Sequence, residues 1–332
     1  MRAILVGLLL GCCGLSASVA ADQVPIARGA DVGWLSEMEA AGTTFYDENG
    51  QPKDCLQILK DHGVNAIRLR VWVNPPKGWC GKDDVVKMAK RAAAMGFRLL
   101  IDFHYSDTWA DPQKQPKPAA WQKDTPAQLE QHVYDHTFEV LKALEAAGVR
   151  PEWVQVGNEI TNGMLWPEGK TANWAELVRL VNRGYDAVKA VDPAIQVVVH
   201  LNNGQDNAMY RQWFDGAIKG GMKFDVIGMS LYPDRPNSGT LAVADACLAN
   251  LRDMAARYGK GVMICEVGYF ADEPQATKEL LAKVIKGCEA IPDGRGLGVF
   301  YWEPESFTQH YDRGAWQANG RPTLAIDAFG TN

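Results

Sequence analysis

Two glutamates in this 332-residue chain stand where a carboxyl group can do chemistry. Glu159 follows the apolar run Trp153–Val156 after one glycine and one asparagine. Glu266 comes directly after a second apolar run, Val262–Cys265. A carboxyl group in such a place is held by a buried strand and still reaches a substrate. One carboxyl that protonates a departing oxygen, and a second that attacks carbon or activates water, together cleave a glycosidic bond.

The two glutamates must differ in pKa to act as such a pair. We expect Glu159 to hold its proton as the acid and later to act as the base, with Glu266 ionised as the nucleophile. Because each carboxylate repels charge on the other, the pair holds one proton more easily than none. We expect Arg70 to keep Glu266 charged and Tyr232 to donate a hydrogen bond to it. Asn158, next to the acid, is expected to hydrogen-bond a sugar hydroxyl.

Each glutamate also has an alternative interpretation. Glu266 would suit a buried ion pair with Arg68 or Arg70, with no part in chemistry. An asparagine followed by a glutamate arises often by chance, so the pair alone identifies nothing. Glu303 and Glu305 compete for either catalytic role, although they fit the start of a helix or loop equally well.

Eight short apolar runs, each followed by a helical pattern, would carry these residues. The predicted strands are Gly29–Trp34, Ala66–Val73, Arg98–His104, Trp153–Val156, Gln196–Leu201, Val226–Leu231, Val262–Cys265 and Leu297–Trp302. Helices are predicted to start near Asp54, Thr125 (with Gln128 in a capping box), Asn173 (with Glu176), Thr240 and Thr277. This alternation predicts an α/β fold, a (β/α)8 TIM barrel formed as a single domain by residues 21–332. An open doubly wound sheet is the alternative, but no GxGxxG turn follows an early strand.

In such a barrel the chemistry takes place where the strands end. The strand ends carry polar and aromatic residues that we expect to support the site: Arg70, Trp72, His104, Asp107, Trp109, Asn158, Asn202, Tyr232 and Trp302. The tryptophans offer flat apolar faces that suit the C–H faces of a sugar, although each also suits a core position. His104 fits a hydrogen-bonded structural histidine better than a base.

The composition and the N-terminus narrow the class of protein. A formal charge of −6, with no run of five like charges, argues against a nucleic-acid-binding surface. Residues 1–20 have the form of a signal peptide, and their apolar run is too short to span a bilayer. They predict a secreted or periplasmic protein, with lipid anchoring at Cys12 as the alternative. No later stretch predicts a membrane span.

Cysteines and histidines give no sign of a metal or cofactor. Five cysteines follow residue 20, and their spacing fits no zinc site: Cys55, Cys80, Cys247, Cys265 and Cys288. Cys265, inside an apolar strand, is expected to be a small core residue, and the spacing leaves any disulfide pairing open. His132 and His136 stand four residues apart without the glutamate of a metalloprotease motif, so a polar helix face is favoured over a metal site.

These motifs resemble glycoside hydrolase family 53, the endo-β-1,4-galactanases. The matching segments are Gly29–Asp31, Arg68–Pro75, Asp102–Pro112, Val156–Glu159, Tyr232–Pro233, Cys265–Tyr269 and Tyr301–Pro304. The resemblance implies a TIM barrel and a retaining mechanism with Glu159 as acid/base and Glu266 as nucleophile. The resemblance also implies that the polysaccharide partner is β-1,4-galactan of pectin side chains (type I arabinogalactan). No cofactor is expected. We expect a monomer.

The chain also departs from the family pattern. Gly33 and Trp34, at the first strand end, look unusual and would alter a subsite. Some bacterial relatives carry a calcium-binding loop after the last strand, but only residues 303–323 stand there, so no calcium site is expected. The alternatives in function are a related retaining barrel glycosidase that acts on mannan or glucan, and an inactive carbohydrate-binding barrel. The presence of both carboxyl groups argues against the second.

Overall fold

The computed structural model describes residues 25–235 and 240–330. The predicted signal peptide and Cys12 lie outside the described residues. Within the described ranges, no helix combines the length and apolar character that a membrane crossing needs.

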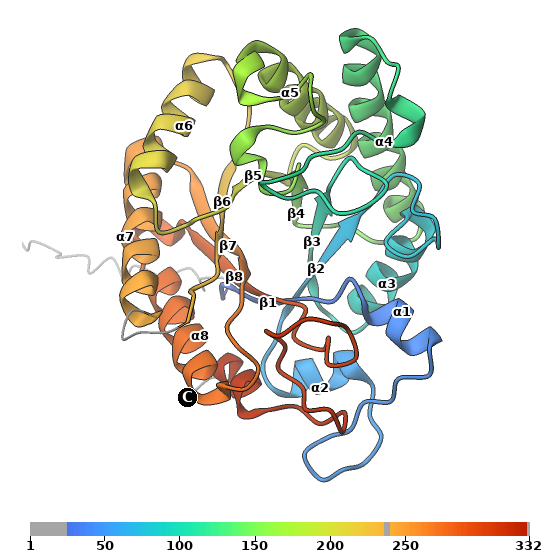
Figure 1. Ribbon diagram of the computed structural model, residues 1–332, viewed down its shortest axis with the longest axis vertical. Helices are drawn as coiled ribbons and strands as arrows, with labels where there is room; N and C mark the ends of the chain where they lie inside the picture. The colour runs from blue at the N-terminus through green and yellow to red at the C-terminus, as the bar shows by residue number, and fades with distance from the viewer. Residues whose placement is uncertain (1–24, 236–239, 331–332) are drawn as a thin grey trace, which may run out of the picture.

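Eight parallel strands close into a barrel in chain order, with helices around them (Figure 1). The strands are β1 (Ala27–Asp31), β2 (Ala66–Val71), β3 (Arg98–Phe103), β4 (Trp153–Val156), β5 (Gln196–Leu201), β6 (Val226–Leu231), β7 (Gly261–Val267) and β8 (Gly296–Trp302). The α-helices are α1 (Leu35–Ala40), α2 (Cys55–Asp61), α3 (Lys82–Ala94), α4 (Pro126–Ala146), α5 (Trp174–Val191), α6 (Asn207–Lys219), α7 (Thr240–Tyr258) and α8 (Pro274–Glu289). Short 3-10 helices are η1 (Ala119–Trp121), η2 (Ile160–Asn162), η3 (Thr171–Asn173), η4 (Pro292–Gly294) and η5 (Leu324–Phe329). The predicted TIM barrel is confirmed.

The first strand differs from its prediction. β1 spans Ala27–Asp31 rather than Gly29–Trp34. The backbone N–H groups of Gly33 and Trp34 donate to the two carboxylate oxygens of Glu303, at 2.9 and 3.1 Å. A side chain from the end of β8 therefore takes the hydrogen bonds that a longer strand would give to its neighbour, and the chain turns into α1.

One helix start also differs from its prediction. α8 begins at Pro274, three residues before Thr277, whose hydroxyl instead donates to the Glu273 carbonyl at 3.1 Å inside the first turn. Asn173 does precede α5, but its side chain makes no capping hydrogen bond. A hydroxyl in the first turn and a cap look alike in sequence, since both bond to nearby backbone groups.

The interior of the barrel has an apolar layer and, closer to the C-terminal ends of the strands, a charged layer. Its apolar layer contains Ala27, Ala66, Leu100, Trp153, Val198, Val226, Met263, Cys265 and Phe300. Because alternate residues of a strand share a face, the next inward positions lie one layer closer to the strand ends. On β2 and β3 these positions are Arg68 and Asp102, both buried. The strands thus place charged groups on top of a packed apolar floor.

The C-terminal segment covers the N-terminal one. Figure 1 shows the red segment after β8 beside the blue segment around α1 and α2. The rings of Phe45 and Phe307 lie 5.7 Å apart, and the Tyr46 N–H donates to the Gly320 carbonyl at 2.9 Å. This contact joins the segment that follows β8 to the loop before α2, beside the pairing of β1 with β8 that closes the barrel.

The five cysteines of the described ranges are all free and buried. Cys265 lies in the apolar layer inside the barrel, as predicted. No disulfide joins any of these five residues, which answers the question of their pairing.

The predicted capping box of α4 is present and gives a direct test of local stability. Thr125 Oγ1 accepts from the Gln128 N–H at 3.4 Å, and Gln128 Oε1 accepts from the Thr125 N–H at 2.9 Å. Thr125→Ala should lower the free energy of unfolding by about 0.5–2 kcal/mol, measured by urea denaturation. Glu139→Ala, at an exposed position of the same helix, is the control and should change it by less than about 0.5 kcal/mol. Equal effects of the two changes would contradict the role given to the cap.

Candidate active site

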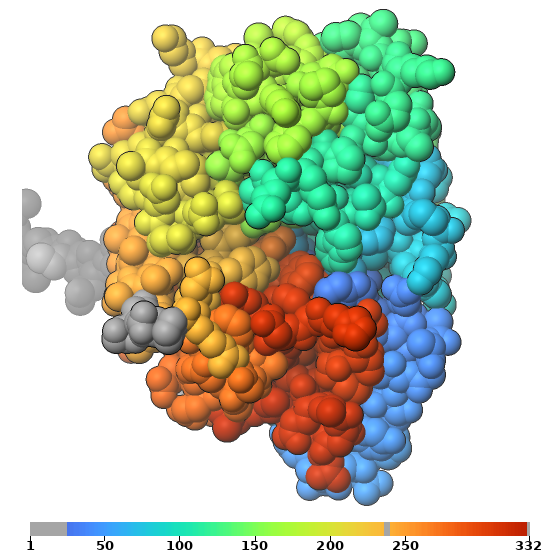
Figure 2. Space-filling model, in the orientation of Figure 1, coloured from blue at the N-terminus to red at the C-terminus, as the bar shows by residue number. Residues whose placement is uncertain are grey.

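A pocket of about 360 Å³ at the strand ends brings most of the predicted site residues together. Figure 2 shows a hollow in this face where the teal segment after β3 meets the red segment after β8. The predicted residues that line the pocket are His104, Trp109, Asn158, Glu159, Tyr232, Glu266 and Trp302. Its wall also contains Ala110, Asp111, Lys114, Tyr311 and Arg313. Four predicted residues are not part of the lining: Arg70, Trp72, Asp107 and Asn202.

Glu159 reaches the pocket through a tight turn after β4. Gly157 has a φ of +83°, and a Cβ atom there would lie 2.6 Å from Cγ2 of Ile160, so the turn requires glycine. Glu159 itself has φ 48° and ψ 50°, a left-handed conformation that is unfavourable for a residue with a side chain. Burial, and next the negative charge of Glu266, raise the pKa of Glu159 to about 8. At neutral pH this carboxyl group therefore carries a proton.

Glu266 meets a different environment, near the end of β7. Its Oε1 lies 3.0 Å from a terminal nitrogen of Arg68, and Tyr232 donates to its Oε2 at 2.8 Å. The predicted hydrogen bond from Tyr232 is present. The predicted partnership with Arg70 is wrong, because Arg70 lies one inward position further along β2 and pairs with Glu303 instead. Glu266 thus contacts a cation and a hydroxyl donor, neither of which contacts Glu159 in the hydrogen bonds and ion pairs of the described residues.

Arg68 is the central cation of the site. Its guanidinium contacts three carboxylates: Asp31 at 2.5 Å, Asp102 at 2.9 Å and Glu266 at 3.0 Å. It also donates to the side-chain oxygen of Asn158 at 2.9 Å. Arg68 is 1% exposed. One buried guanidinium thus holds together groups from four different strands or strand ends.

Arg70 lies among aromatic rings at the edge of the pocket. Its guanidinium carbon is 4.3 Å from the ring centre of Trp109, 5.3 Å from that of Trp34 and 5.4 Å from that of Trp72. Trp72 packs edge-on against Trp109 at 5.1 Å, and so supports the ring that lines the pocket. Gly33 must be glycine here, because a Cβ atom would lie 2.1 Å from Nη1 of Arg70. Gly33, one of the two residues after β1 that depart from the family pattern, thus leaves space for the guanidinium of Arg70.

His104 has a fixed tautomer in the structure. Its Nδ1 accepts hydrogen bonds from the Ala110 N–H at 3.1 Å and from the Trp72 indole at 3.3 Å. Nε2 therefore carries the hydrogen and faces Asp102 Oδ2 at 3.0 Å. With both nitrogens engaged, His104 has no free lone pair to act as a base, which agrees with the structural interpretation.

Asp107, Asn202 and Asn158 are held by protein groups. Asp107 accepts from the backbone N–H groups of Asn74 and Ala119, at 2.9 and 2.8 Å, and so joins two loops. Asn202 accepts from the Thr161 hydroxyl at 2.6 Å. The side-chain amide of Asn158, expected to face a sugar hydroxyl, donates to the Ala110 carbonyl at 2.9 Å. These three residues position the loops that carry the pocket.

Glu303 and Glu305 are both fully buried away from the pocket lining. Glu303 pairs with Arg70 and accepts from the two N–H groups after β1, and it is fully buried. Glu305 is fully buried too, and burial followed by the charge of Glu303 raises its pKa well above the usual range. The same cause, burial, raises the pKa of Asp31. Neither Glu303 nor Glu305 lines the pocket, so neither competes with the two predicted carboxyl groups.

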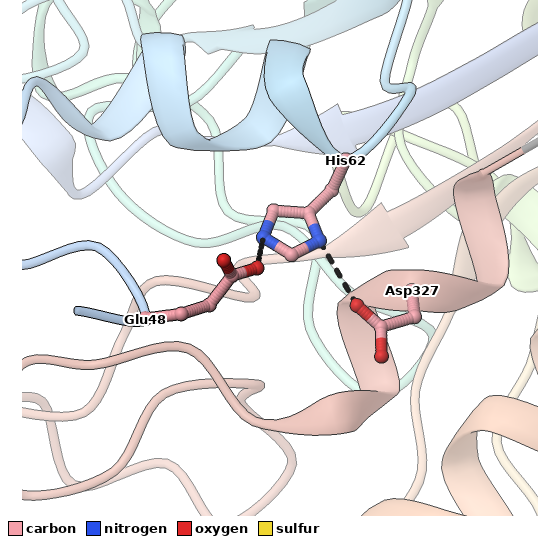
Figure 3. A group of neighbouring side chains, drawn as sticks. All are labelled: Glu48, His62 and Asp327. Carbon is pink, nitrogen blue, oxygen red and sulfur yellow. Dashed lines mark hydrogen bonds and ion pairs between the residues drawn. The ribbon is translucent and has the colours of Figure 1, made fainter.

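One group in the described part of the chain has side chains close enough to share an ion: Glu48, His62 and Asp327 (Figure 3). Glu48 contacts Nε2 of His62 and Asp327 contacts Nδ1, each at 3.0 Å. Each carboxylate faces its own ring nitrogen, so hydrogen bonding accounts for the cluster. It joins η5 to the end of α2, where the chain enters β2, at the end of the barrel opposite the pocket.

The histidine pair of α4 also has an ordinary explanation. His136 packs against the rings of Phe103 and Trp121, and burial lowers its pKa to about 4. His132 stacks on Trp121 at 5.3 Å and faces Asp124 at 3.4 Å. His136 is thus an apolar packing group rather than part of the polar helix face that the spacing predicted.

The family model described as glycosyl hydrolase family 53 matches residues 27–325. The chain belongs to this family. The resemblance drawn from the motifs is therefore confirmed.

Relatives within and near family 53 agree with this assignment. The chain is 38% identical over 304 residues to a probable arabinogalactan endo-β-1,4-galactanase A of Aspergillus terreus, covering 83% of this chain and 85% of the relative. It is 36% identical over 299 residues to an arabinogalactan endo-β-1,4-galactanase of Thermothelomyces thermophilus, covering 83% and 89%. The solved family 53 catalytic domain of Ignisphaera aggregans superposes with a TM-score of 0.84 at 32% identity, covering 92% and 95%.

Sequence reasoning missed several residues of this family 53 site. Arg68 was considered as an ion-pair partner but not as a site residue, and Tyr311 and Arg313 in the pocket wall come from an irregular segment with no periodic signal. His200 and Ser230 are polar residues next to the last residues of β5 and β6. Ser230 Oγ lies 2.6 Å from Oε1 of Glu159 and 2.7 Å from Nε2 of His200. The alternation of β2 signalled Arg68, since Arg68 and Arg70 face the same side.

The role of Arg68 can be tested through stability. Arg68→Met removes the buried cation and leaves three carboxylates without it, so the free energy of unfolding should fall by about 3–5 kcal/mol in chemical denaturation. Arg179→Met removes a half-exposed ion pair on α5 and is the matched control, with an expected change of about 0–1 kcal/mol. A loss at Arg68 no larger than that at Arg179 would contradict the central position of this guanidinium.

Proposed function

We propose that this chain is a retaining endo-β-1,4-galactanase in which Glu159 is the acid/base and Glu266 the nucleophile. The observation that carries the proposal is that two carboxyl groups line one pocket in opposite environments. Burial and repulsion keep a proton on Glu159, whereas Arg68 and Tyr232 hold the charge of Glu266. The fungal relatives are arabinogalactan endo-β-1,4-galactanases by name, and we propose the same substrate, β-1,4-galactan of arabinogalactan, for this chain.

In the first step Glu266 attacks the anomeric carbon while Glu159 gives its proton to the departing glycosidic oxygen. A covalent glycosyl-enzyme forms, and the carboxyl group of Glu159 becomes a carboxylate. In the second step Glu159 takes a proton from water, and the water oxygen displaces Glu266. Two inversions at one carbon give overall retention. Trp109, Trp302 and Tyr311 in the pocket wall offer ring faces to the sugar.

The two alternative functions receive less support. A mannanase or glucanase would need relatives with those activities at comparable identity, whereas the family 53 relatives compared above carry the galactanase name. An inactive binding barrel would have no need of a protonated carboxyl group beside an ionised one. We further propose that residues 1–20 direct export, so that the enzyme meets pectin side chains outside the cytoplasm.

The substrate and the nucleophile are tested by one assay. Reducing sugar released from potato-type galactan should exceed that from cellulose and mannan by at least about 100-fold, and Glu266→Ala should abolish it. The anomeric configuration of the first product, followed by NMR, should be β, the configuration of the substrate.

The control for this assay is Glu305→Gln, which removes a buried acid that does not line the pocket and should leave the ratio between substrates unchanged. Equal rates on mannan, or an α-configured first product, would refute the proposal.

The pH dependence tests the acid. Because Glu159 must be protonated in the free enzyme, kcat/KM should fall as pH rises through about 8, by about tenfold per pH unit above it. Below that pH Glu159 stays protonated, and its titration leaves kcat/KM unchanged. The profile is measured on a soluble chromogenic galactoside of at least two sugar units. A basic limb centred near the ordinary pKa of a glutamate, 4.5, would show that Glu159 is not the acid.

A further inference from the structure

The hydrogen bonds around His200 determine which of its nitrogens carries hydrogen. The side-chain oxygen of Asn158 accepts from Arg68 at 2.9 Å and from Gln155 at 3.1 Å, while its nitrogen donates to the Ala110 carbonyl. The orientation of the amide is therefore fixed, and the atom facing Nδ1 of His200 at 3.1 Å is an acceptor. Nδ1 of His200 must carry a hydrogen.

His200 is neutral, so its other nitrogen is an acceptor. The side chain is fully buried, and burial, followed by the charge of Arg68, lowers its pKa well below 6.5. A neutral imidazole with its hydrogen on Nδ1 has a lone pair on Nε2. That lone pair faces Ser230 Oγ at 2.7 Å, so the hydroxyl of Ser230 donates to His200.

Ser230 has one hydrogen but two close partners. Its oxygen is 2.7 Å from His200 Nε2 and 2.6 Å from Oε1 of Glu159. When the hydrogen points to His200, the short contact with Glu159 is a hydrogen bond only if Glu159 supplies a hydrogen of its own. A Ser230 that donated to Glu159 would lower the pKa of that carboxyl and leave the His200 lone pair facing an oxygen.

We propose that Ser230, oriented by His200, is a positioning residue that accepts a hydrogen bond from the protonated carboxyl group of Glu159 and so keeps the acid ready. The chain runs from Glu159 through Ser230 and His200 to Asn158 and ends at Arg68. This inference rests on the proposed function, because it concerns the acid of that reaction.

The same hydroxyl serves both halves of the reaction. When Glu159 passes its proton to the departing oxygen, the Ser230 hydroxyl rotates from His200 to the new carboxylate and donates to it. When Glu159 later takes a proton from water, the hydroxyl rotates back. No bond to hydrogen breaks at Ser230 or His200, so the proton balance of the reaction is unchanged.

Other groups also act on the proton of Glu159 and are the same in each variant below. The charged and titratable groups near it, from the elements around the pocket, are Glu266, Arg68, Asp111, Tyr232, Tyr210, His104, Lys114 and Arg313. None of them contacts Ser230 Oγ in the hydrogen bonds of the described residues. A change at Nε2 of His200 should therefore alter the pKa of Glu159 through the hydroxyl of Ser230.

Two substitutions distinguish the effect of the hydrogen bond at Nδ1 of His200 from the effect of the hydrogen bond at Nε2. The amide of asparagine reaches as far as Nδ1 and keeps the bond to Asn158, whereas the amide of glutamine reaches as far as Nε2 and keeps an acceptor for Ser230. His200→Asn should move the basic limb of kcat/KM to lower pH by about one unit, because Ser230 then donates freely to ionised Glu159. His200→Gln should leave the limb near its wild-type position. A limb that stays in place or moves to higher pH in His200→Asn would overturn the proposal.

Because His200 is fully buried, a measurement on the wild-type protein accompanies these variants. In protein with 15N-labelled histidine, His200 should carry hydrogen on Nδ1 and not on Nε2 at neutral pH. The Nε2 resonance should shift with the same midpoint as the kinetic limb, as Ser230 turns toward Glu159. Hydrogen on Nε2 would overturn the proposal whatever the variants do. Hydrolysis that survives Glu266→Ala would defeat the proposed function instead, and would leave the NMR result on the Ser230 hydrogen bond intact.

Discussion

The buried guanidinium of Arg68 is the interaction on which the site depends. It contacts Asp31 from β1, Asp102 from β3 and Glu266 from β7, and it donates to Asn158 after β4. A cation in the interior is tolerated only when its surroundings supply charge and acceptors, and those surroundings here come from across the barrel. These ion pairs therefore depend on the closed barrel, since their members come from β1, β2, β3 and β7.

The charged layer of the barrel contains more acidic groups than cations, and this excess places Glu159 and Glu266 in different electrostatic environments. Arg68 and Arg70 are the cations, and Asp31, Asp102, Glu266 and Glu303 lie against them. No cation pairs directly with Glu159 among the described residues, and its carboxyl group contacts the hydroxyl of Ser230 instead. The charge of Arg68 lowers the pKa of Glu159, but burial and the charge of Glu266 outweigh it. Burial raises the pKa of a carboxyl group, and a guanidinium placed against the same carboxyl group opposes that shift. The barrel can then hold an acid and a nucleophile at one sugar at the same pH.

The sequence was enough to predict the barrel, the strands β4, β5 and β6 to the residue, and the meeting of Glu159 and Glu266 in one pocket. Those strands are short apolar runs with sharp ends, so their limits coincide with changes in residue type. The partner of Glu266 was predicted wrongly because Arg68 and Arg70 face the same side of one strand. Sequence spacing gives the side but not the depth, and depth decides which guanidinium meets β7 and which meets the rings of Trp34 and Trp109. The end of β1 was missed because Glu303, far away in sequence, takes its hydrogen bonds.

The central claim is that Glu266 becomes covalently bonded to the sugar while Glu159 does not. The most direct measurement is to trap that bond with a 2-deoxy-2-fluoro-β-galactosyl substrate that carries a good leaving group, and to map the labelled peptide by mass spectrometry. The fluorine slows both steps and the leaving group restores the first, so the intermediate accumulates. The label should lie on Glu266. A label on Glu159 or Glu303, or turnover with no trapped species and with inverted product, would contradict the account.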